Sequence, residues 1–347
     1  MTRASHKLAA SALAVALLAP VAHASLALSY QFNGKGNWSI DGVGSNSTPV
    51  GIVQASVPFG SKVEKAFLYS SAAWGNTLSS LVFDGTTLDS TDFADLGSTG
   101  SLRAYRADVT EQVRAKVGAG SATRFDFTVN AESPNFGLDG EVLAVIYSNP
   151  TETERTIAFM DGFSATTGDT FKVNLGAPLI DPTTPGFEAL FSLGIGFGYQ
   201  PSGQYSRVDV NGRRLTTSAG GFDDGAPANG GLITVGGLDD SSANPSPFAL
   251  PSDSRSDDEL YNLAAGNSAD PAPFLTAGLT SFTIDTLNPS GDDNIFFAGL
   301  NLTARAGVNQ PPPPPVDMGA VPEPSTYGLM GGAALLALVA RRRFRRK

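Results

Sequence analysis

Cysteine and histidine are almost absent from this chain of 347 residues, which contains no cysteine and two histidines. Both histidines, His6 and His23, lie near the N-terminus, where two basic residues and an apolar run lead to Ala22-His23-Ala24. A basic start, an apolar run and a small-residue ending are typical of a secretory signal peptide. We therefore expect signal peptidase to remove residues 1–24 at the site marked by Ala22 and Ala24. A first helix of the mature fold is the alternative, but the run has no polar face.

The exported chain would then contain neither histidine nor cysteine. This excludes nucleophilic systems built on Ser-His-Asp or Cys-His, and it excludes zinc, haem and iron-sulfur sites held by those side chains. Disulfide bonds are excluded as well, although an oxidising compartment would permit them. Any chemistry must come from carboxylates, hydroxyls, amides and a few basic groups.

Positive charge is scarce in the body of the chain: between Ser25 and Pro324 there are 15 Lys and Arg residues against 33 Asp and Glu. Such an acidic body repels the phosphates of nucleic acids and anionic membrane surfaces, so we exclude nucleic acids as partners. It suits a protein that stays soluble outside the cell or attracts divalent cations.

Helical periodicity is rare, and short alternating runs take its place. Runs bounded by Gly, Asn, Asp, Ser and Pro cover Lys62–Trp74, Ser80–Leu88, Thr123–Ala131 and Glu141–Asn149. Alternation between turn-forming residues predicts β-strands. The best helix candidate is Arg106–Val117, with Asp108 or Thr110 as its cap, and Gly118 should end it.

The second half of the chain repeats the pattern of the first. Three pairs of segments correspond: Phe187–Tyr199 with Lys62–Trp74, Tyr205–Thr217 with Leu78–Ser90, and Leu279–Ala304 with Ser121–Asn149. Such self-similarity predicts a duplicated β-domain, although convergent β-hairpin patterns would look the same. We predict an all-β fold of two related antiparallel β-sandwich (jelly-roll-like) domains, residues 25–150 and 151–306, with a short helix and long acidic loops.

The second predicted domain carries an insertion, residues 220–273, rich in Gly, Asp, Ser, Asn and Pro. This composition buries little apolar surface, so we expect long surface loops there. Five consecutive prolines then fall within residues 307–320, and a proline run favours an extended linker. Domain packing should end near Ala306.

The last segment, residues 321–347, holds positive charge that the body lacks. After Val-Pro-Glu-Pro-Ser-Thr come 14 mainly apolar residues, Tyr327–Ala340, and then a basic cluster of Arg341, Arg342, Arg343, Arg345, Arg346 and Lys347. Fourteen residues fall short of the roughly 20 that a spanning helix needs. A locally thinned bilayer would accommodate them as a short transmembrane helix, with the arginines held on the cytoplasmic side.

This order of residues resembles the PEP-CTERM sorting domain, over about 26 of the 347 residues. The resemblance implies that Pro322, Glu323 and Pro324 form the motif of an exosortase, a membrane protease/transpeptidase that removes the tail. It also implies a Gram-negative bacterium that makes exopolysaccharide, a transient inner-membrane intermediate, and a final place at the outer surface or in the extracellular matrix. An ordinary C-terminal anchor is the alternative.

Acidic clusters are the one constellation in the body that suggests a cofactor, namely calcium. Calcium takes about six to eight oxygen ligands, which loops rich in Asp, Asn and Gly supply. The best placed cluster is Asp292, Asp293 and Asn294, at the entrance of a predicted strand. The chain has no EF-hand loop, and solvated turn acids are the alternative.

Two further hypotheses concern sugars. Pairs of carboxyl groups catalyse glycoside hydrolysis, and Asp139 and Glu141 are candidates for such a pair. Their spacing in the sequence does not by itself show that the two carboxyl groups face each other. Aromatic rings stack on sugars, and Trp38, among Gly, Asn and Ser, is the candidate glycan-binding residue. Trp74 ends an apolar run and is expected in the core.

The function expected from the sequence is non-catalytic: an exported, exosortase-sorted protein of the cell surface or extracellular matrix, with a structural or interaction role. One alternative is a calcium-dependent, lectin-like glycan-binding module, and another is an envelope carbohydrate-active enzyme. The expected partners are signal peptidase and exosortase during export, and exopolysaccharide afterwards.

Overall fold

The computed structural model describes residues 25–46, 48–118, 121–131, 137–164, 167–197, 206–220, 233–248, 259–289 and 294–312. Within these ranges nearly all regular structure is antiparallel β-strand, arranged in three sheets. The predicted all-β, sandwich-type fold is confirmed. The signal peptide with Ala22 and Ala24, most of the linker, the sorting segment, and Asp292 and Asp293 lie outside the described residues.

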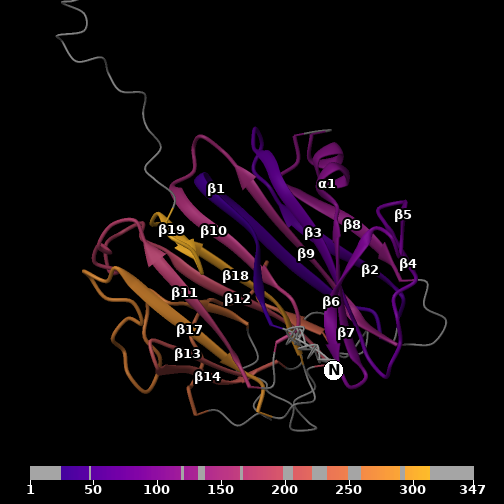
Figure 1. Ribbon diagram of the computed structural model, residues 1–347. Coiled ribbons are helices and arrows are strands. Elements are labelled where there is room, and N and C mark those ends of the chain that lie inside the picture. Colours follow the sequence, from indigo (N-terminus) through magenta and orange to yellow (C-terminus); the bar gives the residue numbers. More distant parts are fainter. Residues whose placement is uncertain are drawn as a thin grey trace, which may run out of the picture.

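The first half of the chain forms sandwich 1, in which a four-stranded sheet packs against one end of the largest sheet (Figure 1). The small sheet has the order β2-β8-β4-β5, and the large sheet contributes β1-β9-β3-β7-β6. The bounds are β1 Ala27–Gly44, β2 Val50–Ser56, β3 Lys62–Ala72, β4 Ser80–Phe83, β5 Thr86–Asp89, β6 Phe93–Thr99, β7 Leu102–Asp108, α1 Thr110–Val117, β8 Arg124–Asn130 and β9 Leu138–Ser148.

The second half forms sandwich 2, whose five-stranded sheet has the order β14-β13-β17-β11-β19 and packs against the other end of the large sheet (Figure 1). The large sheet contributes β10-β18-β12, and β15 and β16 both pair with β12. The bounds are β10 Glu154–Asp161, β11 Asp169–Leu175, β12 Ala189–Gly196, β13 Ser206–Val210, β14 Arg213–Ala219, β15 Ile233–Val235, β16 Leu260–Asn262, β17 Ser281–Leu287, β18 Asn294–Leu302 and β19 Ala306–Val308.

Both sandwiches share one pairing order. In the small sheets β2-β8-β4-β5 corresponds to β11-β17-β13-β14, and in the large sheet β1-β9-β3 corresponds to β10-β18-β12. The hairpin turns also agree: Asp84-Gly85 and Asn211-Gly212 all have positive φ, which a tight two-residue turn requires. This agreement supports the predicted repetition of the chain.

Strand β1 belongs to both sandwiches. Residues 27–35 pair with β10 and residues 36–44 pair with β9, so one continuous sheet runs through both halves. The change of partner falls at Gly36, where a Cβ atom would lie 2.2 Å from the carbonyl oxygen of Tyr147. Only glycine permits this close approach. The boundaries of the two predicted domains stay a prediction, since strand β1 joins the halves.

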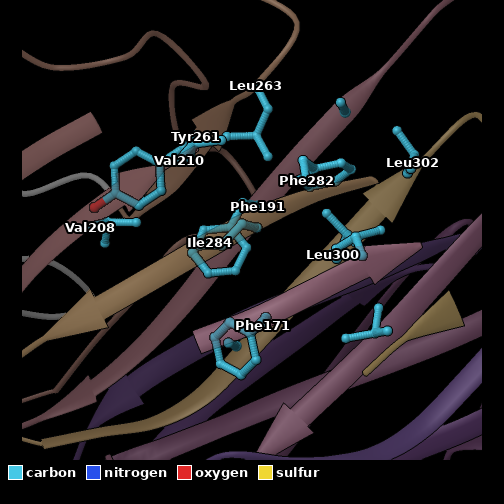
Figure 2. Close-up of a cluster of buried hydrophobic side chains, with 14 of the residues drawn as sticks. Phe171, Phe191, Val208, Val210, Tyr261, Leu263, Phe282, Ile284, Leu300 and Leu302 are labelled. Atoms are coloured by element: carbon cyan, nitrogen blue, oxygen red, sulfur yellow. The ribbon is translucent and has the colours of Figure 1, made fainter. Parts of the chain in front are cut away.

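Each sandwich has its own apolar core. In sandwich 1 the core lies between β3 and β9 on one sheet and β2, β4 and β8 on the other, with Phe83 and Phe127 stacked 5.4 Å apart. Figure 2 shows the core of sandwich 2, where Phe171 of β11 and Phe191 of β12 lie 6.4 Å apart beside Tyr261. Burial of these large side chains is the main favourable contribution to folding.

A third core joins the two sandwiches. Tyr69 of β3 packs against Phe296 and Phe297 of β18, with ring centroids 6.1 and 5.1 Å apart. The Tyr69 hydroxyl donates to the carboxylate of Asp161 at 2.9 Å, and the guanidinium of Arg106 donates to the same carboxylate at 2.7 Å. The sandwiches are therefore joined by apolar contacts and by the part-buried ion pair between Arg106 and Asp161.

Two expectations about local structure need correction. The helix begins at Thr110 rather than Arg106, because residues up to Asp108 pair with β3 as strand β7; Gly118 caps its C-terminus as predicted. The expectation of surface loops for residues 220–273 is wrong for β15 and β16, where Ile233, Val235 and Tyr261 have no exposed surface. These short apolar runs pair with the otherwise open edge of β12.

Candidate functional site

The carboxyl groups of Asp139 and Glu141, on strand β9, are fully buried. Glu141 accepts hydrogen bonds from the hydroxyls of Ser45 and Ser70 at 3.3 and 3.4 Å, and Asp139 accepts one from Ser71 at 2.7 Å. Consecutive strand residues point to opposite faces of a sheet, so Ser70 and Ser71 face opposite ways. A register shift between Ser71 and Ala72 leaves Asp139 unpaired in the β3–β9 ladder, so Asp139 follows Ser71 to the face opposite Glu141. The geometry does not bring Asp139 and Glu141 face to face.

Burial also decides the protonation of both groups. It raises the pKa of Asp139 to about 7 and that of Glu141 to about 8, the latter with a contribution from the charge of Asp139. A carboxyl group without water is more stable in its neutral form, and the serine hydroxyls offset only part of this effect. Each group also keeps one oxygen without a hydrogen-bond partner among the described residues.

The two tryptophans lie where the sequence does not place them. Trp38 is half-buried, stacked on Phe159 with ring centroids 6.4 Å apart, and it occupies the space over Gly299. Trp74 is 53% exposed, so the expectation that it lies in the core is wrong. The buried part of its apolar run ends at Ala73, and Trp74 itself has φ 53°, which turns the chain out of β3. Glycan binding by Trp38 stays a prediction.

Trp74 packs edge-on against Phe197, with ring centroids 5.5 Å and planes 86° apart. Phe197 follows β12 as Trp74 follows β3, and it too has a positive φ, 57°. The two repeats therefore meet through equivalent aromatic residues at one end of the molecule. Positive φ is unusual for a bulky side chain, and the surrounding structure must hold both residues in place.

Of the predicted calcium cluster, Asn294 alone is described. It is 1% exposed, and neither polar atom of its side chain has a hydrogen-bond partner among the described residues. In another acidic pair, Asp239 forms an ion pair with Arg124 that lowers the pKa of Asp239, and Asp240 accepts the Gly237 N–H at 2.6 Å. Across the described ranges, no group of three Asp, Glu, His or Cys side chains is placed to hold a metal ion.

The last strand of the described residues is β19, which pairs with β11. Asn309 turns the chain with φ 54° and donates its N–H to the carbonyl oxygen of Lys172 at 2.7 Å. Asn174 then donates to the carbonyl oxygen of Gln310 at 3.0 Å. The last described packing contacts therefore lie within a few residues of Ala306. In the part of the chain that the structure describes, no helix has the length and apolar character to cross a membrane.

Beyond this exit lies the segment with the Pro-Glu-Pro residues and the basic cluster. A protein-family comparison matches residues 320–346 to the PEP-CTERM protein-sorting motif. The chain carries an exosortase sorting signal. This motif marks an exported protein that exosortase processes on its way through the membrane to the cell surface. No curated protein matches the chain as a relative.

Sequence reasoning missed a row of polar side chains on the outer face of sandwich 2. We call Thr170, Asp285, Asp209 and Arg214 the polar row, since they occupy directly paired positions on β11, β17, β13 and β14. The signal was present in the runs Ser206–Val210 and Ser281–Leu287, where a carboxylate falls on the solvent-facing side of an alternating strand. Only the register shows that these residues meet.

Proposed function

We propose that the protein is a non-catalytic structural or interaction protein of the cell surface or extracellular matrix of an exopolysaccharide-producing Gram-negative bacterium. The observation that carries the proposal is the sorting motif at residues 320–346, separated from the end of the body by a proline-rich linker. Exosortase delivers the protein, and the β-sandwich body then acts by contact with its surroundings.

The buried carboxylates support a non-catalytic role. Acid and base catalysis on a sugar requires two carboxyl groups on either side of one bond. Asp139 and Glu141 are instead fully buried and draw hydrogen bonds from serines on opposite faces of the sheet. Their place in the fold is that of interior hydrogen-bond acceptors.

Cell fractionation of a Glu323→Ala variant tests the sorting part of the proposal. We expect the precursor to accumulate uncleaved in the inner membrane, because the acidic centre of the motif is lost. The exposed helix residue Glu111, changed to Ala, is the matched control and should be processed normally. Mass spectrometry of the C-terminus reports cleavage, and normal processing of Glu323→Ala would contradict the proposal.

Glycan binding is the second candidate function, and the exposed ring of Trp74 favours it. A ring fixed edge-on by Phe197 is held ready to stack on a sugar without further ordering. Trp74→Ala should lower retention of the protein on the producer's own polysaccharide, while Phe59→Ala, which removes an even more exposed ring, should not. The calcium dependence predicted from Asp292 and Asp293 is tested by repeating the assay with a chelator.

A further inference from the structure

A hollow of about 160 Å³ lies on the outer face of sandwich 2, against the polar row. Thr170 of β11, Arg207 and Asp209 of β13, and Asp285 and Leu287 of β17 line it. At ~30 Å³ for each water molecule, the hollow has room for about five. That size suits a single ring with its substituents and is too small for a folded peptide.

The hollow presents an acceptor and a donor side by side. Thr170 Oγ1 donates to Asp285 Oδ1 at 2.6 Å, which orients the carboxylate, and Oδ2 has no hydrogen-bond partner among the described residues. Arg207 lies opposite Leu287, two residues from Asp285, so the guanidinium and the carboxylate are diagonal neighbours on one face. Two adjacent hydroxyls of one ligand match this pair, one donating to Asp285 and the other accepting from Arg207.

Arg207 itself is held only loosely by its own protein. Its Nε atom lies 3.3 Å from Asp209 but not in hydrogen-bond geometry, and no described residue accepts from its terminal nitrogens. Asp209 accepts instead from Nε of Arg214. A guanidinium beside a hollow with donors to spare is available to a ligand.

The charges around the hollow select a neutral ligand. The carboxylates of Asp209 and Asp285 are balanced by the guanidinium groups of Arg207 and Arg214. The carboxylates disfavour phosphate and uronate, and the guanidinium group beside Asp285 disfavours a metal cation. A polyhydroxylated ring without charge avoids both penalties.

The repeat supplies an internal comparison. The positions in sandwich 1 that correspond to the polar row carry Val50, Asn130, Val82 and Thr87, which pair across β2, β8, β4 and β5 in the same way. The fold therefore does not need charges there. Like charges directly across a ladder, as Asp209 and Asp285 are, destabilise a sheet. The Asp209–Asp285 pair therefore lowers the stability of its sheet, whereas the equivalent Val82–Asn130 pair of sandwich 1 has no such repulsion.

We propose that the hollow beside the polar row binds a neutral sugar ring, with Asp285 accepting from one hydroxyl and Arg207 donating to its neighbour. The inference rests on the interaction role proposed above and names a ligand class for it. It is independent of Trp74, which lies at the end of strand β3 in the other sandwich.

Saturation-transfer NMR on the full-length chain in detergent tests it, with glucose, galactose, mannose, N-acetylglucosamine and glucuronate as probes. We expect at least one neutral sugar to bind, and Asp285→Asn and Arg207→Gln each to weaken it by about tenfold or more, as expected for hydrogen bonds to charged groups. Asn130→Ala, at the matching position of sandwich 1, should leave binding unchanged. Trp74→Ala is measured alongside to separate the two candidate sites.

Other outcomes overturn the proposal in distinguishable ways. Sugar binding lost only in Trp74→Ala would leave the glycan-binding role standing and remove the hollow as its site. Binding of glucuronate alone, or binding abolished by EDTA, would contradict direct recognition of a neutral ring, and no binding by any probe would overturn it outright. Circular dichroism checks folding, and if Asp285→Asn is unstable, Thr170→Ala replaces it, with weaker binding expected because the carboxylate loses its orienting hydrogen bond.

Discussion

The two sandwiches share a strand order but differ in which equivalent positions carry polar side chains. Inside sandwich 1, Ser70 of β3 faces Glu141 of β9; at the corresponding positions of sandwich 2, Leu193 faces Ala298. Both sandwiches build a core, yet one encloses a carboxyl group and the other is apolar there. On the outer faces, the positions of sandwich 1 that correspond to the polar row carry the uncharged residues Val50, Asn130, Val82 and Thr87.

The comparison of the two sandwiches shows which positions the fold requires to be apolar. Phe127 of β8 and Phe282 of β17 are equivalent and both are buried. Phe127 lies two residues before Val129, which pairs with Phe83, and Phe282 lies two residues before Ile284, which pairs with Val210. These apolar positions agree between the repeats because each small sheet must bury one face. The polar positions differ because the fold tolerates several residue types there, and these are the positions at which functions can diverge.

The largest expected effect comes from truncating the shared apolar positions. Phe127→Ala and Phe282→Ala should each lower the free energy of unfolding by about 3–5 kcal/mol, since each removes a buried ring and leaves a cavity. Chemical denaturation measures the loss. Because the third core joins the sandwiches, we expect a single transition in both variants; two separate transitions would show that the sandwiches unfold independently.

The carboxyl group inside sandwich 1 should make stability depend on pH. Burial raises the pKa of Glu141 from 4.5 to about 8, so the folded protein keeps a proton that the unfolded chain loses above about 4.5. The folded state then binds more protons than the unfolded state, and stability falls as pH rises from about 4.5 to about 8, by roughly 1.4 kcal/mol per pH unit.

Over this pH range the loss sums to about 5 kcal/mol, and Glu141→Gln should remove it. Because a buried amide without a full set of partners costs about 1–3 kcal/mol, the variant should be about 2–4 kcal/mol more stable than the natural protein at pH 8. Denaturation midpoints between pH 4 and pH 9 report the effect. Glu111→Gln, on the exposed face of α1, is the control and should follow the natural profile. An unchanged pH profile in Glu141→Gln would show that this group does not hold its proton.

The smallest expected effect concerns the two equivalent hairpin turns. Gly85 and Gly212 have φ of 81° and 75°, and a Cβ atom at either would meet no other atom within 4 Å. Alanine there is strained by its backbone conformation alone, so Gly85→Ala and Gly212→Ala should each cost about 1 kcal/mol. Thermal denaturation should show equal losses, and a much larger loss at one turn would mean that the turns are not equivalent.

Local patterns in the sequence were enough to predict most of the strands. Alternating runs such as Thr123–Ala131 form strands because one face of each must be buried. Asp84-Gly85 forms a turn because both residues adopt the positive φ that a two-residue hairpin turn requires. The repeat was visible for the same reason. The prediction of surface loops for residues 220–273 missed β15 and β16, because an apolar run of three residues is too short to be recognised as a strand among Gly, Asp and Ser.

By itself, the sequence determined the all-β class, the repeat and the sorting motif, because alternation, turn residues and a linear motif are local properties of a chain. The tertiary structure alone decided that β1 serves both sandwiches, that Glu141 is enclosed while Trp74 is exposed, and that Asp209 and Asp285 meet in one row. Burial and cross-strand register arise between residues far apart in the chain, so no local pattern encodes them.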